Sequence, residues 1–185
     1  MPEITVWTKQ NTAVLEQLGS RGRFVADEKY IRRELGDTAP VMLYIYRWLA
    51  DHVPIAGEKP ADTVYPVWVS FFKEATMMPE PGYTILELKL DTDAVAAVDI
   101  IKWTQITNYS YLPSDEEDEK AHRRLLDDYG IDDARAVMTQ FYPEIRNKII
   151  HSWDRLFDPV PEPGDPGTYG IVWEVRKEWV QRVIT

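Results

Sequence analysis

Residues 169–185, YGIVWEVRKEWVQRVIT, carry the apolar, β-branched pattern that decides the predicted fold. In an extended chain alternate side chains point to opposite faces, so one face would hold Tyr169, Ile171, Trp173 and Val175. Glu174 then falls on the other face, in the middle of an apolar strand. That face meets either solvent, where Glu174 would pair with Arg176 or Lys177, or a ligand cleft, where the carboxylate would be available for chemistry.

Three further segments have the composition of β-strands. EITVWT (3–8) reads as a short first strand, and YPVWVSFF (65–72) is the continuous apolar run of a central strand. YTILELKLD (83–91) alternates, which indicates a strand with one buried face. The sequence therefore predicts strands near both ends of the chain and in its middle.

Between these strands the apolar spacing and the capping residues predict helices. They are expected over 11–22, 27–35, from Pro40, from Asp99, over 114–130 with Ser114 and Glu117 at capping-box spacing, over 132–141, and from Pro143. The whole pattern predicts one α+β domain over residues 1–185, with small mixed or antiparallel sheets and several helices.

Composition narrows the class of protein. Of the 185 residues 44% are apolar, with 7 Trp and 10 Tyr, which is typical of a folded domain with a large aromatic core. The absence of cysteine removes disulfides, thiolate nucleophiles and Cys-based zinc sites. No basic leader with an apolar core and no membrane-length apolar run is present, so we expect a soluble, cytoplasmic protein that does not bind membranes.

The charge is unevenly distributed along the chain. Residues 1–60 carry equal numbers of acidic and basic side chains, so the net charge of −10 comes from residues 61–185. This balance argues against broad nucleic-acid binding, which needs concentrated positive charge. The basic residues that could bind a single small phosphate, or simply form a solvated helix face, are Arg21, Arg23, Arg32 and Arg33.

Common catalytic and metal-binding motifs are missing from the sequence. It contains no G-x-G-x-x-G, Walker loop, H-E-x-x-H or G-x-S-x-G. His52, His122 and His151 are scattered, without the i, i+4 spacing of a helical metal site, so no metal site is predicted.

Polar and aromatic residues inside or beside apolar segments are the remaining site candidates. They are Thr8, Gln10, Trp68, Ser70, Asn108, Tyr109, Tyr111 and Glu174. An aromatic cleft with a few convergent polar groups suits a nucleotide or another flat heteroaromatic ligand. The alternative is that the aromatic members simply pack in the core.

Seven short stretches carry a family resemblance, and they are VWTKQ, YIYRWLADH, YPVWVSF, LELKL, VDIIKWTQITNYSYL, SWDRLF and IVWEV. In this order they resemble domain-of-unknown-function family 3841 over nearly the whole chain. More distantly, the layout resembles the ADP-ribosyltransferase superfamily. That superfamily binds NAD in a cleft between two small sheets, and a late glutamate stabilises the oxocarbenium-like ribose as nicotinamide leaves.

The superfamily resemblance implies roles for individual residues. Thr8 matches the polar residue of the first strand, Trp68 or Ser70 the central-strand position, and Glu174 the catalytic acid. A nearby carboxylate stabilises the positive charge that develops on the sugar in the transition state.

The same resemblance implies that NAD would be the cofactor, held by Gln10 and Asn108 and stacked on Trp68 or Tyr111. The first strand carries neither the His nor the Arg of the superfamily, and Tyr169 stands where the catalytic acid of the superfamily usually lies.

The sequence therefore leaves two hypotheses. The first is a non-catalytic or divergent module that binds a nucleotide or a protein partner, and the second is an NAD-dependent mono-ADP-ribosyltransferase.

Overall fold

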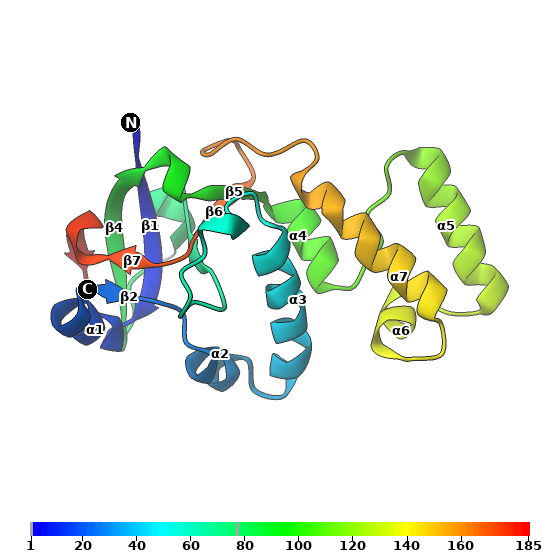
Figure 1. The fold of residues 1–185 in the computed structure, drawn as a ribbon, viewed down its shortest axis with the longest axis horizontal. Helices are drawn as coiled ribbons and strands as arrows, with labels where there is room; N and C mark the ends of the chain where they lie inside the picture. Colours follow the sequence, from blue (N-terminus) through cyan, green and yellow to red (C-terminus); the bar gives the residue numbers. More distant parts are fainter. Residues whose placement is uncertain (1, 77) are drawn as a thin grey trace. The chain divides into compact units, whose positions relative to one another are not determined.

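The computed structural model describes residues 2–76 and 78–185 and divides into two compact units (Figure 1). Unit 1 comprises Met1–Val98 and Pro161–Thr185, and unit 2 comprises Asp99–Val160. The predicted α+β class is confirmed, because unit 1 contains small sheets and unit 2 is helical. One domain over the whole chain stays a prediction, since compactness does not measure whether the two units unfold together.

The first sheet of unit 1 has the strand order β1–β4–β8. Its members are β1 (Glu3–Asn11), β4 (Tyr83–Asp91) and β8 (Val180–Ile184), and both pairings are antiparallel. The buried face predicted for 83–91 is confirmed, because Thr84, Leu86, Leu88 and Leu90 are all buried, but Ile85 on the opposite face is buried as well. The predicted buried face and Val6 of β1 contribute to the main core of unit 1.

The second sheet has the order β3–β6–β5. It contains β3 (Val67–Val69), β5 (Ala96–Asp99) and β6 (Thr168–Val172). The predicted central strand 65–72 is shorter than expected. The two sheets meet where Trp7 and Ser70 exchange backbone hydrogen bonds, with N···O distances of 2.9 and 2.7 Å.

The predicted uninterrupted final strand is wrong. β6 ends at Val172, and the chain pairs again only in β7 (Val175–Arg176), which lies against β2 (Arg23–Phe24). The interruption has a physical cause, because the Trp173 indole donates to the Ile55 carbonyl at 2.8 Å and Glu174 binds two arginines. Glu174 therefore lies between strands.

The helices of unit 1 begin and end close to the predicted positions. They are α1 (Ala13–Arg21), α2 (Glu28–Leu35) and α3 (Ala39–His52). Asn11 accepts from the Ala13 amide, Gly22 ends α1 with a positive φ of 72°, and Asp27 caps α2. α1 packs beside β2, and α2 packs beside α3.

The helices of unit 2 are α4 (Ile100–Thr107), α5 (Glu116–Tyr129), α6 (Asp133–Met138) and α7 (Pro143–Ser152). α4 begins directly after Asp99, as predicted, and Asp99 caps it. The predicted Ser114–Glu117 capping box of α5 is wrong. Its cap is Asp115, whose carboxylate accepts from the Asp118 amide at 2.8 Å. The core of this unit includes the fully buried side chains of Trp153, Ile106, Ile149, Leu156 and Ala136.

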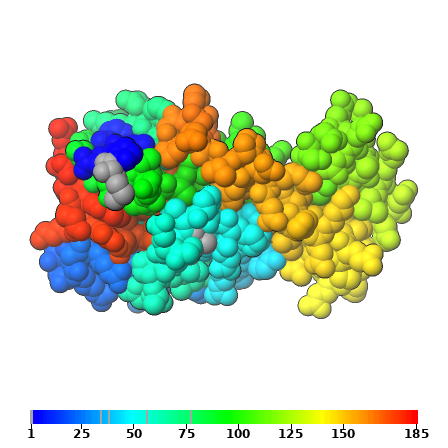
Figure 2. All heavy atoms as spheres, turned by 45° about the horizontal axis from the view of Figure 1, so that its top comes forward, coloured from blue at the N-terminus to red at the C-terminus, as the bar shows by residue number. Residues whose placement is uncertain are grey.

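The described chain also contains six short 3-10 helices, which are Gly36–Thr38, Ala56–Glu58, Lys73–Thr76, Thr92–Ala94, Trp153–Phe157 and Lys177–Trp179. In the space-filling view, segments from both ends of the sequence, blue and red, contribute to one face of unit 1 (Figure 2). Unit 1 is thus assembled from residues on both sides of unit 2 in the sequence.

Candidate functional site

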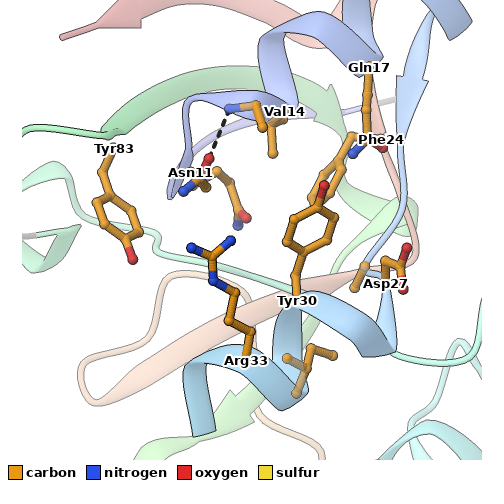
Figure 3. A pocket seen from close by; sticks show the side chains of 12 residues that line it. Asn11, Val14, Gln17, Phe24, Asp27, Tyr30, Arg33 and Tyr83 are labelled. Atoms are coloured by element: carbon orange, nitrogen blue, oxygen red, sulfur yellow. Dashed lines mark hydrogen bonds between the residues drawn. The ribbon is translucent and has the colours of Figure 1, made fainter. Parts of the chain in front are cut away.

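A cavity of about 310 Å³ opens in unit 1 at the end of β1 (Figure 3). Its walls come from Gln10 and Asn11 of β1, the start of α1, Tyr30 and Arg33 of α2, and Tyr83 at the start of β4. Its volume is at the lower end of the range of small-molecule sites.

A second cavity of about 170 Å³ adjoins the first. The residues that line both are Gln10, Phe24, Ala26 and Ile31. The second cavity extends along Tyr46, Tyr65 and Trp68. We refer to the two together as the unit 1 cleft, and its two parts as the Arg33 cavity and the Trp68 cavity.

Tyr65, which lines the Trp68 cavity, is held in place by two side-chain hydrogen bonds. The hydroxyl of buried Tyr65 donates to Glu28 at 2.9 Å and accepts from Arg47 at 3.1 Å. Burial is the main reason that the pKa of Tyr65 is raised. The hydrogen bond from Tyr65 is in turn the main reason that the pKa of Glu28 is lowered. These contacts connect α2 to α3 and hold α2 against the cleft.

Arg33 supplies positive charge to the cleft. Figure 3 shows its guanidinium between the rings of Tyr30 and Tyr83, directed toward Asn11. Within residues 2–76 and 78–185 Arg33 makes no ion pair, and the lining carboxylate of Asp27 accepts from the Lys29 amide at the cap of α2. The guanidinium is therefore available to an anionic ligand.

The arginine cluster considered from the sequence separates in the structure. Arg23 pairs with Glu174 and Asp62, and Arg32 pairs with Glu28 at 2.6 Å. Arg33 is the member that lines the cleft, whereas Arg21 is not among its lining residues. The pair of Arg32 with Glu28 lies within α2, at the i, i+4 spacing visible in the sequence. The partners of Arg23 come from distant segments, which spacing alone does not reveal.

Three predicted site residues lie together at the joint between the two sheets. Thr8 Oγ1 donates to the Trp68 carbonyl at 2.7 Å, and Gln10 Nε2 donates to Thr8 Oγ1 at 2.8 Å. Gln10 and Trp68 line the cleft, whereas Thr8 is only 2% exposed and lies beneath them. Ser70 is buried and donates to the Phe72 carbonyl at 2.6 Å, so its hydroxyl is used locally.

Glu174, the predicted catalytic acid, does not line the cleft as the structure describes it. It is 7% exposed and accepts from Arg23 Nη1 and Arg176 Nε, both at 2.6 Å. Pairing with Arg176 is confirmed, but a solvent-facing position is wrong because the carboxylate is buried between the two arginines. Burial alone would raise the pKa of Glu174, but the two arginines outweigh it and hold the pKa below its ordinary value.

Asn108 and Tyr111 belong to unit 2, where their polar groups have local partners. The Asn108 amide donates to the Thr104 carbonyl at 2.8 Å and helps to end α4. The Tyr111 hydroxyl donates to Asp118, and its ring stacks on His122 with 4.0 Å between centroids. Burial, followed by the bond to Asp118, raises the pKa of Tyr111. These contacts account for both residues within the packing of unit 2.

Sequence reasoning missed several residues of the cleft, notably Asn11, Tyr30 and Tyr83. Tyr30 and Arg33 are three positions apart in a predicted helix, so their side chains share one face. This spacing could have indicated that Tyr30 lies beside Arg33. Tyr83 offered no such signal, because its position depends on the pairing of β1 with β4, where Asn11 lies opposite Tyr83.

Among the residues that the structure describes, no group of three or more His, Cys, Asp or Glu side chains is arranged to hold a metal ion. Nor does any described helix have both the length and the apolar character needed to cross a bilayer.

The geometry thus defines an α+β chain whose unit 1 carries a cleft lined by aromatic rings, amides and one available arginine. Residues 5–181 match a family model described as "Domain of unknown function (DUF3841)", and the chain belongs to this family. No curated protein and no solved structure gives a significant match to the chain.

Proposed function

We propose that unit 1 is a binding module for a nucleotide-class ligand, whose phosphate pairs with Arg33 and whose planar ring lies in the cleft. The observation that carries this proposal is the guanidinium of Arg33, which lies between the Tyr30 and Tyr83 rings and makes no ion pair within the described residues. A planar guanidinium can bind two phosphate oxygens at once.

The rest of the cleft suits the remainder of such a ligand. The Trp68 cavity has no charged lining residue in the described chain and presents Tyr46, Tyr65 and Trp68. A flat, uncharged ring would contact these aromatic side chains, while the phosphate stays beside Arg33. The amides of Gln10 and Asn11 provide hydrogen bonds for the ribose or the ring.

Binding can be tested by titrating the full chain with AMP, ADP-ribose, NAD and adenosine, following the melting temperature and the heat of binding. A ligand that binds only the folded state raises the melting temperature in a saturable way. We expect AMP, ADP-ribose or NAD to do so, and adenosine, which lacks the phosphate, to bind more weakly.

Arg33→Gln should lower the affinity for the phosphate-bearing ligands by about tenfold or more, because a charge-assisted pair is lost. The matched control is Lys29→Gln, which removes the same charge from an exposed position on α2 outside the cleft. Equal effects of the two variants, or no binding by any of the ligands at millimolar concentration, would contradict a nucleotide site. The cleft would then be reassigned to a protein partner.

A second candidate function is NAD-dependent mono-ADP-ribosyl transfer. It is favoured by one observation: two three-stranded sheets meet at Trp7 and Ser70, and Gln10 and Trp68 line a cleft at that joint. In this reaction the bond between the ribose C1′ and the nicotinamide nitrogen breaks, and its electron pair leaves with nicotinamide. The acceptor nucleophile bonds to C1′ and loses a proton.

Nicotinamide release from NAD tests this second candidate. Glu174 would have to leave Arg23 or Arg176 to reach the ribose, because both of its oxygens are bound by arginine. Release by the wild type that is abolished in Glu174→Gln, while NAD still binds, would favour the transferase. Binding without release would favour the non-catalytic module.

A further inference from the structure

Gln10 occupies a particular place in the unit 1 cleft. Of the described residues that line both cavities, which are Gln10, Phe24, Ala26 and Ile31, it carries the only polar side chain. A ligand that extends from Arg33 to Trp68 must pass this amide. Its orientation therefore decides which hydrogen-bonding groups the ligand meets between the two cavities.

The orientation of the Gln10 amide is set by a short chain of hydrogen bonds. Thr8 and Gln10 are two positions apart on β1, so their side chains share one face of the strand. The Thr8 hydroxyl has one proton, and it is used toward the Trp68 carbonyl at 2.7 Å. Toward Gln10 the hydroxyl oxygen can then only accept, so the amide must direct Nε2 to it, at 2.8 Å.

This arrangement leaves Oε1 and one N–H of Gln10 for the ligand. An amide that presents an acceptor beside a donor matches a ring edge that carries a donor beside an acceptor, such as the amino edge of adenine. Thr8 itself is 2% exposed, and its oxygen already has two partners, so it is not positioned to touch a ligand.

We propose that Gln10 is a specificity-determining residue that selects a ring with adjacent donor and acceptor groups, and that Thr8 is the positioning residue that fixes the Gln10 amide. This proposal rests on the nucleotide-binding function proposed above. The sequence pattern made both Thr8 and Gln10 candidate ligand-binding residues. In this proposal only Gln10 contacts the ligand, and Thr8 acts through Gln10.

The test compares AMP with purine riboside 5′-monophosphate, which keeps the phosphate and the ring but lacks the exocyclic amino group. Affinities of both are measured by calorimetry for the wild type, Gln10→Leu, Thr8→Val and Thr8→Ser. We expect the wild type to prefer AMP by about tenfold, as for a bidentate amide–adenine pair. Gln10→Leu and Thr8→Val should lose this preference, and Thr8→Ser, which keeps the hydroxyl, should retain it.

The two monophosphates should bind Gln10→Leu with similar affinity, because the Arg33 contact is unchanged. A wild type that prefers AMP while Thr8→Val keeps the preference would overturn the role of Thr8. Unchanged preference in Gln10→Leu, or no preference in the wild type, would overturn the role of Gln10. In all three cases phosphate-dependent binding would still stand. Failure of the wild type to bind either compound would remove the role of Gln10, and the nucleotide site itself would be removed if ADP-ribose and NAD also failed to bind. Thr8→Ala replaces Thr8→Val if the latter does not fold, as judged by circular dichroism.

Discussion

Glu174 joins parts of unit 1 that are far apart in the sequence. Its carboxylate accepts from Arg176, two residues away, and from Arg23, 151 residues away, and Arg23 also pairs with Asp62. The carboxylate thereby links β2 to β7, and Arg23 extends this link to the loop before β3. A buried carboxylate with two charged donors is stabilising only as long as both donors remain in place.

We predict that Glu174→Gln lowers the free energy of unfolding by about 1–3 kcal/mol, because a neutral amide cannot accept equally well from two guanidinium groups. Chemical denaturation of both proteins at pH 7 measures the change. Glu178→Gln is the matched control, since it removes the same charge from an exposed position nearby. If both variants were equally stable, Glu174 would have no structural role in joining these segments.

Glu174 and Arg33 show how far the sequence predicts the role of a single charged residue. The sequence identified both as candidates, one as an acid in an apolar segment and one as part of a basic cluster. It indicated that Glu174 could pair with Arg176, two residues away, but not that Arg23 would bind the same carboxylate or that Arg33 would stay available. The last two depend on contacts between distant segments, and neither spacing nor composition reports those contacts.

Helices were predicted more successfully than strands because their signals are local. Capping residues, glycine at the end of a helix and the apolar stripe all lie within about ten residues, so α1, α2, α4 and α5 were expected at nearly the right positions. β2 and β5 were not predicted, and β8 lies inside the stretch that was expected to form one uninterrupted strand. β2 and β5 are two and four residues long, and the existence of each depends on a partner strand rather than on its own pattern.

Asp115 caps the N-terminus of α5 and contributes to its stability. Asp115→Ala should lower the free energy of unfolding by about 1 kcal/mol, because the Asp118 amide loses the acceptor that caps the helix. In a Ser114–Glu117 capping box, Glu117→Ala would lower the free energy of unfolding by a similar amount. Because Asp115 is the cap, we expect Glu117→Ala to change the free energy of unfolding by less than about 0.5 kcal/mol. Thermal unfolding measures both variants, and a larger effect for Glu117 would show that the capping box forms in solution.

Acid should destabilise both units of the molecule. In unit 1 the pKa of Glu28 is lowered mainly by its bond from Tyr65, and the pKa of Glu174 by its two arginines despite burial. In unit 2 the pKa of Asp118 is lowered mainly by the Ser114 amide. A carboxyl group with a lower pKa in the folded state stabilises the fold above its unfolded pKa, and loses that contribution as the pH falls through the folded value.

The expected pH profile follows from these directions. The free energy of unfolding should change little from pH 7 to about pH 5, and fall as the pH drops below the ordinary carboxyl values of 4.5 and 3.8. Glu174→Gln should show a shallower fall than the wild type, because it lacks one of the groups that must be protonated. Identical slopes for the two proteins would contradict a lowered pKa of Glu174 in the folded state.

The assembly of unit 1 from both sides of unit 2 has a consequence for the protein during its synthesis. β6 lies between β3 and β5, so these two strands have no common partner until residues 168–172 leave the ribosome. β4 likewise keeps one free edge until β8 is made. A growing chain therefore carries unpaired strand edges while unit 2 already has all of its residues, and in this interval chaperones should bind unit 1.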